Sequence, residues 1–302
     1  MKYEHVISYV ARTPWAIAPE KMQDLLAVLA FRAAGYEFTQ EELRARLGDE
    51  PPAPPDPKQR GAVAILPLRG VIAHRMGSLD ESSGGMSAER FTKMVQQAAA
   101  DPSVGTILLD VDSPGGTVPG VMEAADAVYA ARQSKKVVAI ANSMMASAAY
   151  WIASQAEELV AIPSALDRVI GSVGVFTVHQ DLTAALEKQG IKVTVIKSGE
   201  NKFEGNPFEP LTEETRAAMQ ASVDAANEKF VKAVARGRGV TAAVVRQQFG
   251  DGRAFPAADA KNAGLIDKIA TFDETVARLA GRKASTGLRA EADPQRMRSS
   301  RL

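Results

Sequence analysis

The strongest constraint on the fold is an alternation of short apolar segments with segments of helical periodicity. Three apolar runs, 62–68, 104–111 and 136–141, have the length and composition of buried strands. Helical patterns over 87–100 and 118–132 lie between them. Because a strand, a helix and a second strand form one parallel crossover unit, this pattern predicts an α/β domain with a mostly parallel sheet and covering helices.

The alternation continues less regularly in the second half of the chain. The further expected strands are 158–162, 173–178 and 192–196. The further expected helices are 146–155, 182–189 and 212–236. Together they extend the α/β pattern over most of the chain.

The two ends of the chain differ from this central pattern. Residues 1–48 predict an N-terminal helical extension, and 49–60 form a proline-rich, polar linker. Residues 284–302 are polar and predict a disordered tail. We therefore expect one catalytic or binding domain over 61–283.

Composition argues against several classes of function. The 36 Lys and Arg residues balance 36 Asp and Glu residues, so nothing in the net charge favours nucleic acid or an anionic membrane. The chain has no cysteine and three histidines, so we expect no metal and no other cofactor. No apolar run approaches the roughly 18 residues of a membrane span, and we expect a cytoplasmic protein without a membrane anchor.

A glycine-containing turn follows the second strand. The sequence DSPGGT, residues 112–117, stands between that strand and the next helix. Two glycines leave backbone N–H groups uncovered, and a helix N-terminus adds partial positive charge, so the turn can hold an anion or a developing oxyanion. Considered alone, an ordinary strand-to-helix turn explains the same residues.

A serine among small residues follows the third strand. In the stretch ANSMMASAAYW, residues 141–151, Ser147 is expected near the start of a helix, with the backbone N–H of Ala148 beside its hydroxyl. Close packing of a helix on a sheet also favours alanine and serine. Ser143 is a rival nucleophile, although a helix N-cap is a natural role for it.

A nucleophilic serine needs a general base. None of the histidines has an acidic partner arranged as in a triad; they are His5, His74 and His179. A lysine can act as base when burial and hydrogen bonds bring its pKa from about 10.4 toward neutrality. The loop over 196–203 carries two candidates, Lys197 and Lys202, but a loop lysine is ordinarily only solvated.

In their order and spacing these segments resemble the signal peptide peptidase A (protease IV) family of the Clp-protease/crotonase superfamily. The resemblance runs from about residue 63 to about residue 279. The matching motifs are LDVDSPGGT (109–117), MMASAAYWIAS (144–154), IGSVGV (170–175), VIKSGENK (195–202), GRG (237–239) and GLID (264–267).

The resemblance implies a spiral of ββα units and a serine endopeptidase with a Ser/Lys pair. Ser147 matches the family nucleophile, and Lys202, not Lys197, matches the base. Ser172 in IGSVGV matches a residue that orients the lysine. The residues matching the oxyanion hole are Gly115, Gly116 and Ala148. This chain has Ala148-Ala149 where the family more often has glycines.

The N-terminal extension and the proline-rich linker resemble the phage head-maturation (prohead) proteases of that family. This branch implies a capsid scaffold or capsid protein as substrate, a homo-oligomeric ring, and a location in the host cytoplasm, including the interior of the prohead. Three alternatives stay open: a bacterial peptidase that degrades signal peptides, a crotonase-like acyl-CoA enzyme without a serine nucleophile, and a catalytically silent capsid or scaffold component.

Overall fold

A computed structural model describes residues 13–33, 39, 42, 57–76 and 85–281. Its centre is a mostly parallel sheet with the strand order β10-β7-β6-β5-β3-β2. These strands are β10 (Lys268–Ile269), β7 (Glu158–Ala161), β6 (Lys136–Ala146), β5 (Thr106–Thr117), β3 (Val63–Ala73) and β2 (Lys58–Arg60). All neighbours in this order are parallel except β2, which is antiparallel to β3.

Four short strands extend the sheet. β4 (Met86–Ser87) pairs with β3 and β8 (Ile170–Gly171) with β6, both in parallel. β9 (Ala254–Phe255) is antiparallel to β8, and β1 (Trp15–Ile17) is antiparallel to the last residues of β5. The carboxyl-terminal ends of β5 and β6 are therefore bordered by additional backbone, which matters for the site described below.

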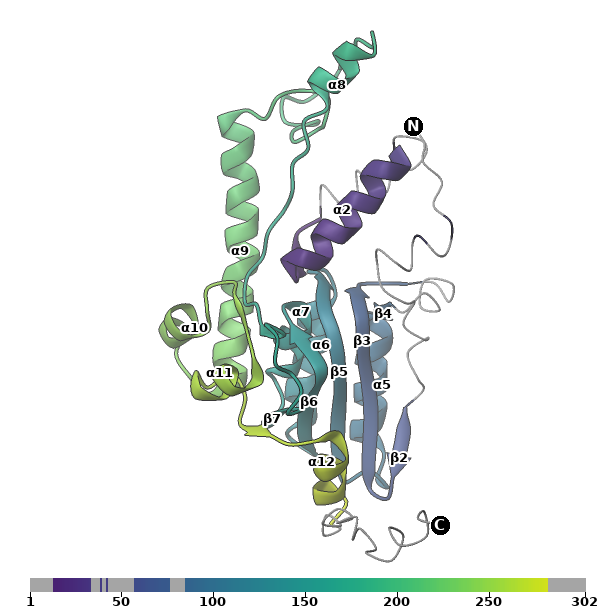
Figure 1. Cartoon of the computed structure of the whole chain (residues 1–302), viewed down its shortest axis with the longest axis vertical. Helices are drawn as coiled ribbons and strands as arrows, with labels where there is room; N and C mark the ends of the chain where they lie inside the picture. Colours follow the sequence, from purple (N-terminus) through teal and green to yellow (C-terminus); the bar gives the residue numbers. More distant parts are fainter. Residues whose placement is uncertain (1–12, 34–38, 40–41, 43–56, 77–84, 282–302) are drawn as a thin grey trace, which may run out of the picture.

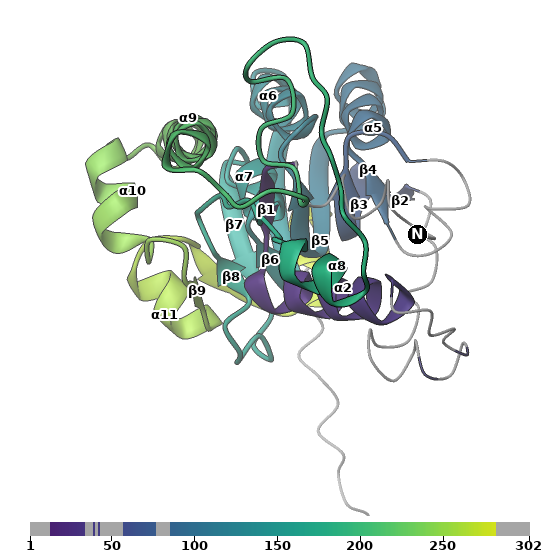
Figure 2. The ribbon, with the colours of Figure 1, turned by 90° about the horizontal axis from the view of Figure 1, so that it is seen from above.

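Helices cover one face of the sheet. α5 (Ala88–Ala100), α6 (Val121–Ala131) and α7 (Ala148–Ala153) lie side by side on it in both views (Figures 1 and 2). Their buried residues, such as Phe91 and Val128, join those of alternate strand positions in the main hydrophobic core. This packing follows from the two periodicities, because every second strand residue and every third or fourth helix residue faces the same layer.

The opposite face of the sheet is covered by α12 (Phe272–Leu279), whose Val276 packs with Ile65 and Leu108. α2 (Pro19–Ala33) crosses near the carboxyl ends of the central strands, on the side away from α5 and α6 (Figure 2). These observations confirm the predicted α/β architecture with a mostly parallel sheet and covering helices.

A long helix, α9 (Glu213–Arg238), joins the core through its C-terminal part. Phe230 stacks on Trp151 of α7 with ring centroids 4.5 Å apart, and both side chains are buried. α10 (Ala242–Gln248) and α11 (Ala257–Asn262) follow it. The other end of α9 reaches beyond the sheet.

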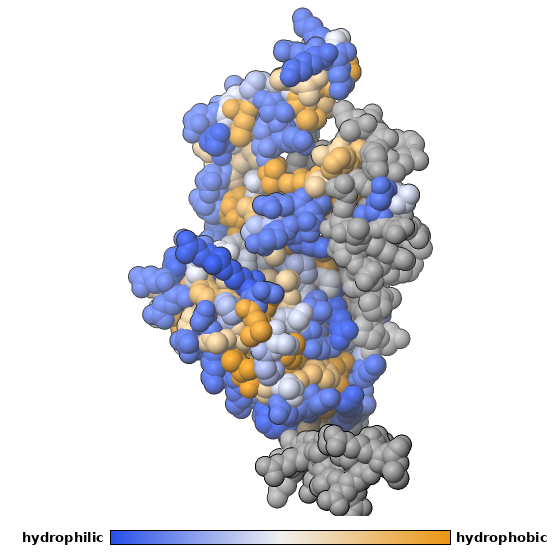
Figure 3. Space-filling view, viewed as in Figure 1, coloured by the Kyte–Doolittle hydropathy of each residue, from blue (hydrophilic) through white to orange (hydrophobic). Residues whose placement is uncertain are grey.

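Residues 178–212, called the arm here, carry α8 (Thr183–Lys188) and also extend beyond the sheet, away from α7 (Figure 1). Apolar side chains stand among the polar ones on the arm's surface (Figure 3). The exposed large apolar residues of the arm are Ile191, Val193 and Ile196.

Several predicted elements are wrong. Residues 192–196 form no strand, and 173–178 contain only one β-bridge, from Phe176 to Trp15. Both runs are rich in apolar, β-branched residues, but a strand also needs another strand to pair with. Residues 192–196 lie beyond the sheet, where no described strand is beside them. Residues 15–17, expected to be helical, form β1.

Other elements differ in their bounds. The expected helix over 146–155 covers only Ala148–Ala153, because β6 continues to Ala146. The helical pattern around Met22 is confirmed by α2. Lys58–Arg60, at the end of the expected linker, form β2. Most of the linker and the C-terminal tail lie outside the described residues. Within the described ranges no helix is both long and apolar enough to span a bilayer.

Candidate active site

Ser147 lies at the sharp turn between β6 and α7. Its backbone has φ 55° and ψ −118°, a conformation that costs about 1–3 kcal/mol in a non-glycine residue. Two hydrogen bonds hold it: Ser147 N–H donates to Gly171 O (2.7 Å), and Trp151 N–H donates to Ser147 O (2.9 Å). A serine on a strained strand-to-helix turn is the geometry in which a nucleophile is presented at the end of a sheet.

The hydroxyl of Ser147 is unused in the fold. Ser147 occupies the N-cap position of α7, but its side chain makes no capping hydrogen bond, and Oγ is buried without a partner among the described residues. Ser143 differs: its hydroxyl donates to Asp112 Oδ1 (2.9 Å). Ser143 also lies within β6, so the expected N-cap role for it is wrong. Of the two rivals, Ser147 has the hydroxyl left free to react.

The glycine turn reaches Ser147. It is not a turn out of the strand as expected, because β5 continues through it to Thr117. Gly115 has φ 97°, and a Cβ there would lie 2.9 Å from the nitrogen of Ala148 and 3.0 Å from Cβ of Ser147. A Cβ on Gly116 would lie 1.8 Å from the carbonyl oxygen of Ile72. Both positions therefore exclude a side chain, and the structure brings the two glycines, Ser147 and Ala148 together.

Ser113 is a supporting residue that the sequence analysis missed. Its buried hydroxyl donates to Gly70 O (2.6 Å) and accepts the N–H of Gly115 (3.1 Å). Because the N–H of Gly115 is used in this way, the amides left to face a substrate oxygen are those of Gly116 and Ala148. Ala148 begins α7, so its N–H has no acceptor within the helix. A serine two residues before a glycine was the available signal.

Ser172 lies beside Ser147. The parallel pairing of β6 and β8 places Ala146 opposite Gly171. Ser147 and Ser172, which follow these two residues, are therefore neighbours. Ser172 also has a positive φ, 53°, and is 5% exposed. Its hydroxyl donates to Gly252 O (3.1 Å) and its N–H to Arg253 O (3.0 Å).

Lys202 is not brought to this cluster. It is exposed and lies in a turn of the arm, where its backbone N–H donates to Gly199 O (3.2 Å). Lys197 is exposed on the same arm. Since Oγ of Ser147 has no partner among the described residues, neither lysine is hydrogen-bonded to it.

The histidines do not supply a base in the described structure. Nε2 of His179 lies 3.1 Å from Asn206 O, and the ring of His74 lies against Gly120. His5 lies outside the described residues. No cluster of three His, Asp or Glu residues in the described part of the chain is arranged to hold a metal ion.

The helix that follows Ser147 is firmly anchored. Tyr150 of α7 is buried and donates its hydroxyl to Leu265 O (2.9 Å). Burial raises the pKa of the Tyr150 phenol, so it remains a neutral donor at physiological pH. Nearby, Asp267 accepts the N–H of Leu159 (2.7 Å) and pairs with Arg238 (2.6 Å). The Tyr150 bond ties α7, which follows the turn at Ser147, to the segment that the Asp267 contacts join to β7 and α9.

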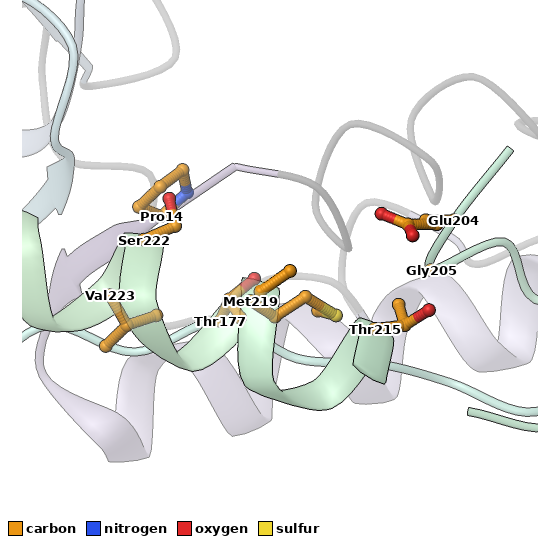
Figure 4. Close-up of a pocket in the computed structure, with 9 residues that line it drawn as sticks. Pro14, Thr177, Glu204, Gly205, Thr215, Met219, Ser222 and Val223 are labelled. Carbon is orange, nitrogen blue, oxygen red and sulfur yellow. The ribbon is translucent and has the colours of Figure 1, made fainter. Parts of the chain in front are cut away.

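A cavity of about 270 Å³ lies next to the site rather than on it. It is bounded by α9, by Glu204 and Gly205 of the arm, and by Pro14, directly before β1 (Figure 4). Neither Ser147 nor Lys202 lines it. Its walls therefore come from α9, the arm, and residues directly before the arm and β1, not from the turn at Ser147.

Comparisons with known proteins agree on one family. Residues 130–286, just over half of the chain, match Peptidase family S49. Capsid assembly protease C of Escherichia phage lambda is 31% identical over 286 residues, which cover 90% of this chain and 64% of that protein. Head-tail preconnector protein GP5 of Enterobacteria phage P21 is 34% identical over 218 residues, covering 72% of this chain and 42% of that protein.

A cellular relative gives the same family. Protease 4 of Salmonella typhi is 29% identical over 221 residues, which cover 73% of this chain and 34% of that protein. The chain thus spans less than two thirds of the length of each of these relatives.

Proposed function

We infer, because this chain belongs to peptidase family S49, that it is a serine endopeptidase with Ser147 as nucleophile and Lys202 as general base. The membership confirms the resemblance to signal peptide peptidase A and protease IV. The observation that carries the proposal is the hydroxyl of Ser147, which is held on a strained turn beside two backbone amides and has no structural partner.

In the proposed reaction, Oγ of Ser147 attacks the carbonyl carbon of the scissile peptide and gives its proton to the lysine amine. The N–H groups of Gly116 and Ala148 stabilise the oxyanion of the tetrahedral intermediate. The lysine then protonates the leaving amine, and water hydrolyses the acyl-enzyme. Ser172, next to Ser147, would orient the lysine.

In this proposal, the exposure of Lys202 favours an assembly. A lysine acts as general base where burial disfavours its charged form, so the proposed role needs a surface that covers the arm. The arm that carries Lys202 also exposes Ile191, Val193 and Ile196. A second copy packed on the arm would bury these residues and place Lys202 beside a serine nucleophile, which supports a homo-oligomer, a ring in our proposal.

The proposed substrate is a capsid scaffold or capsid protein. One relative is named a capsid assembly protease, and it aligns with 90% of this chain. We therefore propose that the enzyme acts during head maturation, in the host cytoplasm and inside the prohead.

Co-expression with a scaffold protein and a capsid protein, taken from neighbouring genes if these encode them, tests the proposal. Cleavage products should form with the wild-type chain and the Ser143→Ala control, and should be absent with Ser147→Ala. N-terminal sequencing of the products would identify the cleaved bonds. Cleavage that persists in Ser147→Ala would refute the proposed nucleophile, and hydrolysis of acyl-CoA thioesters without peptide cleavage would favour a crotonase-like enzyme.

A further inference from the structure

The turn at Ser147 leaves an open strand edge beside the nucleophile. β6 pairs with β5 as far as Met145 opposite Ser113, and then departs into the turn. Beyond that point β5 continues from Gly115 to Thr117, with β3 on its other side. An extended peptide could add to this edge by main-chain hydrogen bonds, the usual way in which a protein binds an extended segment at a sheet edge.

This edge is occupied by the chain itself. β1 pairs with it antiparallel, Trp15 opposite Thr117, Ala16 opposite Gly116 and Ile17 opposite Gly115. On its other side β1 meets Phe176, which exchanges two hydrogen bonds with Trp15, of 2.8 and 3.0 Å. β1 is therefore held between two backbone segments, as an extended substrate would be.

The register places one peptide carbonyl at the reacting position. Two flanking hydrogen bonds show which residue pairs of the antiparallel β1–β5 ladder are hydrogen-bonded. They run from Ala18 N–H to Pro114 O (2.8 Å) and from Val118 N–H to Pro14 O (3.1 Å). Because hydrogen-bonded pairs alternate along such a ladder, Ala16 and Gly116 form the pair between them, and the N–H of Gly116 faces the carbonyl oxygen of Ala16. The Ala16 oxygen also lies near the other amide of the site. A Cβ on Gly115 would be 2.2 Å from this oxygen and 2.9 Å from the nitrogen of Ala148.

The side chains of β1 are accommodated as well. Ala16 is fully buried against the main core, in a space that fits a small residue. Trp15 and Ile17 point to the opposite side, where they are buried with Met22 of α2. α2 therefore anchors the strand and holds it in the site.

We propose that β1 is a tethered pseudosubstrate: it fills the substrate strand position next to Ser147 and closes the site until the N-terminal segment withdraws. The inference rests on the proposed peptidase function. Substrate and β1 require the same amides and the same edge, so they compete. A tethered segment competes at an effective concentration near the millimolar range, so its removal should increase the accessibility of Ser147 considerably.

The rate at which a small alkyl fluorophosphonate modifies Ser147 tests this. Ala16→Arg should expel β1, because a guanidinium cannot be buried in the space that holds the Ala16 methyl group. Gln23→Arg, on an exposed position of α2, introduces the same side chain outside the site. We expect labelling of Ala16→Arg to be at least tenfold faster than that of the wild-type chain, and labelling of Gln23→Arg to be unchanged.

Equal labelling of wild type and a folded Ala16→Arg chain would overturn the inference and leave the peptidase proposal intact. Absence of labelling at Ser147 in every variant would overturn the proposed function and this inference with it. Hydrolysis of the Ala16–Ile17 bond in the wild-type chain, seen by mass spectrometry as a new N-terminus at Ile17, would support the same placement of β1.

Hydrogen exchange in Ser147→Ala gives a readout that needs neither catalysis nor a foldable Ala16 variant. The amides of Gly116 and Val118, which face β1, should exchange slowly in the full chain. Fast exchange at both amides, with the neighbouring core of β5 still protected, would overturn the inference.

Discussion

The backbone N–H of Ser147 donates to the carbonyl oxygen of Gly171 over 2.7 Å, and this bond joins the two halves of the candidate site. It ties the turn after β6 to the end of β8, so that Ser147 and Ser172 stand next to each other. Both serines have a positive φ, 55° and 53°. Backbone strain at two neighbouring residues is expected where the fold positions reactive groups rather than where it only packs.

Replacing Ser147 by alanine should separate activity from stability. Cleavage should fall by roughly 10³-fold or more. The free energy of unfolding should change by less than about 0.5 kcal/mol, because the hydroxyl makes no hydrogen bond to lose. Peptide cleavage and urea unfolding on the same preparations measure both quantities.

Ser143→Ala is the matched control for that variant. It removes a hydrogen bond to Asp112 and should cost up to about 1 kcal/mol while leaving cleavage nearly intact. The reverse result, with Ser143→Ala inactive and Ser147→Ala active, would exchange the two roles.

The two lysines of the arm should also behave differently. Lys202→Ala should abolish cleavage, and Lys197→Ala, equally exposed, should retain it. Neither substitution should change the melting temperature appreciably, since both side chains are solvated. Near-normal cleavage by Lys202→Ala together with loss in Lys197→Ala would show that the base is Lys197.

Mixing inactive variants tests whether the lysine acts between copies. If Lys202 serves a serine in another copy, then combined Ser147→Ala and Lys202→Ala chains should recover part of the wild-type cleavage rate after subunit exchange. Complete absence of recovery, with exchange verified by native mass spectrometry, would mean that the arm refolds onto its own chain instead.

Gly116→Ala should be strongly destabilising. The new Cβ would lie 1.8 Å from Ile72 O, a backbone atom of the central β3 strand that cannot move away cheaply. We expect a loss of several kcal/mol in the free energy of unfolding, in the upper range for single substitutions. At Gly105 the nearest atom would be 3.5 Å away, so Gly105→Ala should be nearly neutral, and equal losses in the two variants would contradict this reading.

Asp267 should contribute to stability in a pH-dependent way. Partial burial raises the pKa of its carboxyl, but hydrogen bonds from Arg238 and Leu159 outweigh this and hold the pKa below its usual 3.8. Because the folded-state pKa is depressed, the contribution is present above the unfolded pKa and is lost as pH falls through the folded pKa.

Asp267→Asn should therefore be less stable than the wild-type chain at pH 7, and this difference should shrink below about pH 4. Urea unfolding at several pH values measures it. Thr241→Ala, which removes the N-cap of α10 without breaking a bond to a carboxylate, serves as a control whose loss of stability should be the same at every pH. A difference between wild type and Asp267→Asn that is constant from pH 7 to pH 3 would exclude the depressed pKa as its cause.

Local patterns were sufficient to predict the parallel sheet, whereas the site residues were chosen through the resemblance to the signal peptide peptidase A family. The runs around Leu108 and Val138 are continuous and apolar because both faces of those strands are buried. Gly115 lies near the carboxyl end of β5, and Ser147 and Ser172 follow β6 and β8; parallel strands bring those ends to one edge. The shared edge explains why Gly115, Ser147 and Ser172 lie together, but it does not place Lys202.

Other features depend on contacts with distant segments of the chain, which a local sequence pattern does not show. The apolar residues near Val193 look like a strand, but they have no strand edge beside them in the described chain. Trp15 to Ile17 form a strand because the departure of β6 at Ser147 leaves free an edge of β5, which lies about a hundred residues further along the chain. Lys202 lies in a turn of the arm, exposed and away from Ser147, and in our proposal a second copy of the chain brings it to the site.

The most direct test of the account is to identify the residue that an alkyl fluorophosphonate modifies. The wild-type chain is incubated to completion, digested, and the adduct is located by fragmentation mass spectrometry in the peptide that holds both Ser143 and Ser147. We expect one adduct, on Ser147, and none in the Ser147→Ala chain. An adduct on Ser143, or no adduct on either serine, would contradict it.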